Sequence, residues 1–127
     1  MEDARVQELR KLRLGLLGLH KTLLVSERAV YQEARGQAIG DRELLDLLFG
    51  DEWFAWLRLI SRLVVEFDEV LDSADPAAGA GWLRERTRDL LKGAAGDAQF
   101  GPRYAEALQR DPDVVMAHAA VVRGLVL

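Results

Sequence analysis

Leu-rich spacing in the first quarter of the chain constrains the fold more than any other feature of the 127 residues. Mostly apolar side chains recur there at alternating intervals of three and four residues, which places them along one stripe of an α-helix. The stripe consists of Leu9, Leu12, Leu16, Leu19, Leu23, Ser26 and Val30. We therefore predict a helix from about Asp3 to Ala34 that ends at Gly36 and packs its stripe against other helices.

Three polar residues, Arg13, His20 and Glu27, lie one heptad apart inside this apolar region. A buried charge needs a partner, so each of them is expected to contact a group on a neighbouring helix. Two interpretations remain open. The residues could form a hydrogen-bond or salt-bridge network that fixes the helix register, or they could line an interior polar pocket for a small ligand. His118 falls on the apolar stripe of the last predicted helix and could join His20 and Glu27 in such a pocket.

The rest of the chain is also predicted to be helical. It lacks the apolar–polar alternation and the hairpin turns that are typical of strands, and Asp-Pro pairs mark two helix starts. Helices are expected over residues 41–49, 52–73, 102–110 and 113–127, with one more that begins at Pro76 or Gly81 and runs to Gly93. The residues from Gly93 to Gly101 are expected to form a loop. The prediction is an all-α, compact bundle of five to six helices with a four-helix-bundle-like core, in a single domain over 1–127.

Several apolar residues fall outside the predicted core. Leu14 and Val25 project opposite the Leu stripe, so the first helix is apolar nearly all round, and such a helix is central to its fold or buried against a second chain. Phe54 points away from the face that Trp53 and Trp56 would share on an α-helix. Aromatic side chains at this spacing usually anchor a core, although one of the three could be exposed. Leu14, Val25 and Phe54 are therefore our candidates for a contact surface, and core packing stays open for Phe54.

Composition and spacing exclude many kinds of site. The chain has no cysteine, which excludes disulfides, Cys-ligated zinc and thiol catalysis. Neither of its two histidines has a carboxylate three or four residues away, the spacing at which two side chains of one helix can bind the same metal ion. His20 and Glu27 are about 10 Å apart along the helix axis, which is too far for this. We therefore predict no metal and no cofactor. No serine lies in a nucleophile-elbow sequence, which argues against an enzyme without deciding the question.

The net charge of −4 argues against a nucleic-acid partner and against a polybasic membrane-surface protein. The N-terminal residues lack a signal-peptide pattern, and no apolar run approaches the roughly 20 residues of a membrane helix. The expected location is therefore cytoplasmic, with no membrane partner.

Two segments are similar to parts of a family of small, all-helical bacterial proteins of unknown function. The first comprises residues 50–58 and continues to Asp68-Glu69, and the second comprises residues 100–112. The resemblance extends from about Leu19 onward, implies a bacterial helical protein, and gives no residue a role.

The functional expectation is a non-enzymatic, soluble helical protein that acts through protein–protein contact, as a homodimer or with another protein. This expectation rests on the nearly all-apolar first helix. The alternative is a bundle that binds a small molecule in an interior pocket near His20, Glu27 and His118.

Overall fold

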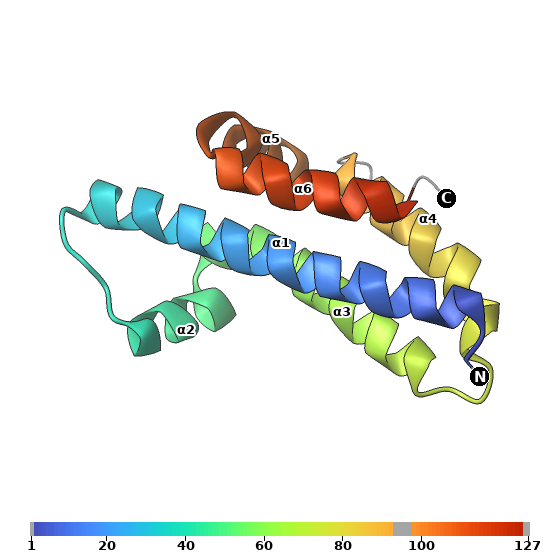
Figure 1. The fold of residues 1–127 in the computed structure, drawn as a ribbon. Helices are drawn as coiled ribbons and strands as arrows, with labels where there is room; N and C mark the ends of the chain where they lie inside the picture. Colours follow the sequence, from blue (N-terminus) through green and yellow to red (C-terminus); the bar gives the residue numbers. More distant parts are fainter. Residues whose placement is uncertain (1, 93–97, 126–127) are drawn as a thin grey trace.

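The computed structural model describes residues 2–92 and 98–125, and most of these residues are helical (Figure 1). This arrangement confirms the predicted all-α bundle of five to six helices. The described residues form α1 (Ala4–Arg35), α2 (Asp41–Gly50), α3 (Arg58–Leu71), α4 (Ala80–Leu91), α5 (Phe100–Arg110) and α6 (Pro112–Leu125), with the short 3₁₀ helices η1 (Glu52–Leu57) and η2 (Pro76–Gly79).

Helix α1 runs through the middle of the molecule, with α6 along one side and α3 along the other (Figure 1). It also contacts α4, α5 and η1, so its Leu stripe is surrounded by the rest of the chain. Leu16, Leu19 and Leu23 have no exposed surface. The predicted apolar stripe of α1 is therefore the centre of the core, since α3, α4, α5, α6, η1 and η2 all contact this helix.

Local sequence signals place the helix ends. Asp3 accepts a hydrogen bond from the Arg5 N–H at the start of α1, and Asp51 accepts one from the Trp53 N–H at the start of η1, each at 2.8 Å. Gly36 ends α1 with a φ of 73°, a left-handed conformation that glycine adopts without steric cost. The first helix therefore ends at the predicted glycine.

The expectation for Phe54 is wrong, because residues 52–57 form a 3₁₀ helix rather than the first turns of an α-helix. With about three residues per turn, Trp53 aligns with Trp56 and Phe54 aligns with Leu57. Phe54 is 0 % exposed and packs on Tyr31 with ring centroids 5.3 Å apart. It is a core residue and cannot contribute to a contact surface.

The predicted loop from Gly93 to Gly101 is described only in part. Residues 93–97 lie outside the described residues. Phe100 and Gly101 belong to α5, which begins two residues before the predicted start at Pro102. Phe100 is buried against Trp56, with ring centroids 5.7 Å apart, so the early start of α5 coincides with an aromatic contact to η1.

Candidate functional site

Each of the three polar residues in the α1 stripe has a partner on another helix. Arg13 Nε donates to Asp68 Oδ1 on α3 at 2.5 Å, and His20 Nε2 shares a hydrogen bond of 3.0 Å with Ser61 Oγ, also on α3. Glu27 pairs instead with α5. The polar groups thus tie α1 to two different neighbours.

Glu27 is the most buried of these groups, with 3 % of its side chain exposed. Arg110 Nη2 donates to Glu27 Oε2 at 3.2 Å and to Ser26 Oγ at 3.0 Å. Arg103 Nη1 lies 3.7 Å from the other carboxylate oxygen. Both oxygens of Glu27 therefore face a guanidinium, and this network locks α1 against α5.

His118 lies in a different part of the molecule. Its Nδ1 shares a hydrogen bond of 2.6 Å with the Tyr104 hydroxyl, and the Tyr104 ring stacks on Phe100. Burial lowers the pKa of His118 from its ordinary value of 6.5 and raises the pKa of Tyr104 above its ordinary value of 10.0. These shifts favour a neutral imidazole that accepts the hydrogen bond from a neutral phenol.

The structure does not bring His20, Glu27 and His118 together. Among the described cavities, His118 lines one between α4 and α6, whereas His20 lines another between α1, α2 and α3. Glu27 lines neither of these cavities and is occupied by its two arginines. The common interior pocket of the small-molecule alternative therefore has no counterpart here.

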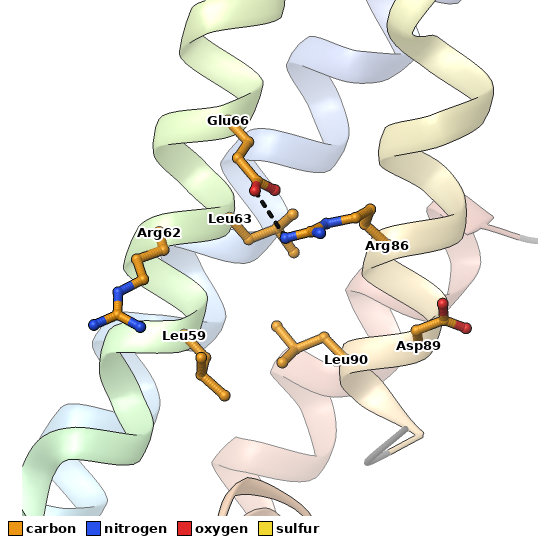
Figure 2. A pocket seen from close by; sticks show the side chains of 7 residues that line it. All are labelled: Leu59, Arg62, Leu63, Glu66, Arg86, Asp89 and Leu90. Carbon is orange, nitrogen blue, oxygen red and sulfur yellow. Dashed lines mark hydrogen bonds and ion pairs between the residues drawn. The ribbon is translucent and has the colours of Figure 1, made fainter. Parts of the chain in front are cut away.

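A cavity of about 400 Å³ between α3 and α4 holds a further ion pair (Figure 2). Arg86 Nη2 donates to Glu66 Oε1 at 2.7 Å across the gap between the two helices, above a floor that Leu63 and Leu90 help to form. Because half of the Arg86 side chain is exposed, this ion pair between α3 and α4 is expected to contribute only modestly to the stability of the fold.

The cavity that His20 lines has a volume of about 460 Å³ and opens between α1, α2 and α3. Arg58 holds α2 at its edge, because Arg58 Nε donates to the Leu48 carbonyl at 3.0 Å and Nη2 donates to the Asp51 carbonyl at 2.9 Å. These bonds satisfy carbonyls at the end of α2 that the helix itself leaves free. The lining residues are His20, Leu48, Phe49, Arg58, Ser61, Arg62 and Val65.

Large apolar side chains are exposed around this cavity. Phe49 is 75 % exposed and Val65 is 53 % exposed, although both line it. Leu45 lies one helical turn before Phe49 on α2, and Leu17 lies on α1 between the residues that bond to α3. Leu14 lines the next hollow along the same α1–α3 seam. We name Leu14, Leu17, Leu45, Phe49 and Val65 the groove face.

Two of the predicted contact residues are indeed exposed, Leu14 by 64 % and Val25 by 62 %. Val25 lies three turns after Leu14 on the outer side of α1, where Gly18 also lies. A Cβ added at Gly18 would meet nothing within 4 Å, so this glycine has no close neighbour inside the chain. A contact role for these positions remains a prediction.

The charged residues that line the cavity between α1, α2 and α3 are both arginines, Arg58 and Arg62. None of the seven residues that line the cavity is a carboxylate, and Arg62 has no carboxylate partner among the described residues. Lys21, exposed beside His20 on α1, has none either. Burial lowers the pKa of His20 from 6.5, which favours its neutral form. The groove therefore combines an apolar surface with a cationic rim in a protein of net charge −4.

Leu17, Phe49 and Val65 were not among the predicted contact residues. One signal pointed to Phe49: residues 41–50 have apolar side chains at Leu44, Leu45, Leu47, Leu48 and Phe49, too wide an apolar arc for one contact. A ten-residue helix that packs through Leu44 and Leu48 must leave Leu45 and Phe49 facing outward.

Within residues 2–92 and 98–125, no group of three or more His, Cys, Asp or Glu side chains could hold a metal ion. None of the helices described combines the length and the apolarity needed to cross a membrane. Comparisons of the chain with protein-family models, with curated proteins and with solved structures give no match.

Proposed function

We propose that this protein acts through protein–protein contact at the groove face and catalyses no reaction. One observation carries the proposal: five large apolar side chains on α1, α2 and α3 are exposed, of which Phe49 and Val65 line a cavity with an apolar wall and Leu14 lines the neighbouring hollow. Clusters of exposed apolar side chains on a protein surface often mark a site where another molecule binds. The partner is another protein chain, either a second copy, as the sequence analysis expected, or a different protein.

The polar side chains support contact rather than catalysis. Arg13, His20 and Glu27 each bond to a side chain of another helix, and His118 bonds to Tyr104. A general acid or base needs a free face toward a substrate, next to a nucleophile or an electrostatic stabiliser. The bonds of Glu27 and Arg110 instead hold helices in register, which suits a rigid scaffold for a binding surface.

A photo-crosslinking experiment tests the proposal. Benzoylphenylalanine replaces Phe49 in the cell that makes the protein, and a control carries it at Trp82, an exposed aromatic residue on α4. We expect a protein adduct at Phe49 and none at Trp82, and mass spectrometry distinguishes a second copy from another chain. No adduct at Phe49, or equal adducts at both positions, would overturn the proposal.

Sedimentation velocity tests the homodimer in parallel. If the contact is self-association, the wild type approaches twice the monomer mass as its concentration rises through the micromolar range. Phe49→Ser removes this association, whereas Trp82→Ser leaves it unchanged. A monomer at all concentrations excludes the homodimer and leaves a different protein as the partner.

A further inference from the structure

We propose that the partner presents an amphipathic helix with acidic side chains beside its apolar stripe, and that this helix lies in the groove between α1, α2 and α3. The inference rests on the proposed contact function and names the chemistry of the partner. Apolar grooves between helices commonly bind the apolar face of a further helix, whose anchors recur at intervals of three and four residues.

The shape of the site fits such an occupant. Helices α1 and α3 run antiparallel, as the bonds Arg13–Asp68 and His20–Ser61 show, and leave an elongated seam with Leu14 and Leu17 on one side and Val65 on the other. Phe49 borders the cavity of about 460 Å³ that can receive an apolar anchor. The hydrogen bond between His20 Nε2 and Ser61 Oγ gives each of these two atoms a partner, which lowers the cost of covering them with an apolar anchor.

The charges select an acidic partner. Arg58 and Arg62 line the cavity, and Lys21 is exposed on α1 beside His20, while no carboxylate lines the cavity. Carboxylates do occur on the same helices, although none lines the cavity: Asp46 and Glu69 are exposed on α2 and α3, and Asp68 and Asp72 line the neighbouring hollow. Asp68 is paired with Arg13, which reduces its effect on the groove.

The same charges argue against an isologous pairing of two groove faces. Two copies joined face to face would place Arg58 and Arg62 of both chains in one interface, with no carboxylate from either cavity lining. Like charges held together at an interface cost free energy and suppress the wrong partner, whereas opposite charges speed association and fix the register. A partner with glutamate or aspartate beside its apolar stripe removes this conflict.

Two labelled peptides test the inference by fluorescence anisotropy. Each is a designed 18-residue helix with leucines at i, i+3, i+4 and i+7, and the flanking positions are glutamate in one peptide and lysine in the other. We expect the full-length protein to bind the glutamate peptide, to bind it more weakly as salt is added, and to leave the lysine peptide free.

Charge reversal provides the matched controls. Lys21→Glu/Arg62→Glu should weaken binding of the glutamate peptide by about a hundredfold, roughly tenfold per reversed charge, and create binding of the lysine peptide. Arg123→Glu, an exposed position on α6, should change neither affinity. Circular dichroism of each variant shows that the fold is kept. Equal binding of the two peptides, or no exchange of preference on charge reversal, would overturn the inference.

The other outcomes separate this inference from the proposed function. If Phe49 crosslinks to a protein but the glutamate peptide does not bind, the contact function stands and the acidic helix is wrong. If neither crosslink nor peptide binding occurs, both fail. If vesicles of phosphatidylcholine with phosphatidylglycerol bind through Lys21 and Arg62 while the peptide does not, the groove recognises an anionic lipid surface, and both proposals fail.

Discussion

The two sides of α1 differ in how completely they are covered. On the side of α5 and α6, the Glu27 carboxylate is buried next to Arg103 and Arg110. Helix α6 also packs closely there, because a Cβ added at Gly15 would lie 3.3 Å from Val121 Cγ2. Toward the groove, Leu17 and Val65 remain exposed, and His20 is only partly covered. One helix with a nearly continuous apolar surface thus has a tightly packed side and an open side.

Burial of an apolar or polar residue on α1 therefore depends on which side chains the neighbouring helix supplies. Helix α5 supplies two guanidiniums to Glu27, so the charge can be buried with its oxygens bonded. Helix α2 is only ten residues long and turns Leu45 and Phe49 away from the core. The groove therefore stays open because too little chain lies beside it.

The largest expected effect comes from two phenylalanines five residues apart. Phe54→Ala should lower the free energy of unfolding by about 3–5 kcal/mol, because it leaves a cavity in the core. Phe49→Ala should change it by less than about 0.5 kcal/mol, because its side chain is exposed. Urea denaturation measures both. Similar losses for the two variants would show that the groove side is covered in solution.

The next effect concerns the buried carboxylate. Arg110→Met should cost about 3 kcal/mol of unfolding free energy, because it leaves Glu27 buried with only Arg103, at 3.7 Å. Glu27→Gln should cost less, because the arginines are partly exposed and can be solvated. Arg62→Met, on the groove side, should cost almost nothing.

A double-mutant cycle by thermal or chemical denaturation checks the coupling of this pair. Glu27→Gln combined with Arg110→Met should be more stable than Arg110→Met alone, because the uncompensated charge is gone. If the two losses simply add, Glu27 and Arg110 do not interact as the structure indicates.

Alanine substitutions of two glycines on α1 should change the stability of the protein by a smaller amount. Gly18→Ala should stabilise the protein by about 1 kcal/mol, because alanine is a better helix former and its Cβ meets open space. Gly15→Ala should gain little or lose stability, because Val121 must move to accommodate the Cβ. Thermal unfolding monitored by circular dichroism measures the difference. A destabilising Gly18→Ala would indicate that something packs closely on this side of α1.

The smallest effect is a dependence on pH. Burial lowers the folded-state pKa of His20 and of His118 below 6.5, so the unfolded state binds protons first as the pH falls. Stability should therefore decrease as the pH falls through about 6.5 toward the lower folded-state values, and should be unaffected by these groups at higher pH.

Denaturation midpoints at about pH 7.5 and pH 5.5 measure this effect, since the imidazoles titrate in that window. His20→Asn should remove part of the decrease, and His20→Asn/His118→Asn should remove more of it. A decrease of unchanged size in the double variant would assign the pH dependence to other groups.

Much of the fold could be predicted because its signals are local. The alternating Leu spacing, the glycine at position 36 and the Asp-Pro pairs report on dihedral angles and helix faces within a few residues. The need of Arg13, His20 and Glu27 for partners across the helix interface also followed from their positions. Phe54 was misplaced because an α-helix and a 3₁₀ helix differ by little over six residues, yet they rotate side chains to different faces.

Residue spacing alone was enough to predict amphipathic helices around one long apolar helix whose polar residues need partners. The identity of these partners, Asp68, Ser61 and Arg110, follows only from the packing of the helices, because they lie 55, 41 and 83 residues away along the chain. The packing also decided that α2 leaves a groove open. The physical reason is that periodicity and capping act over a few residues, whereas burial depends on which distant helices have enough length and suitable side chains to cover a given face.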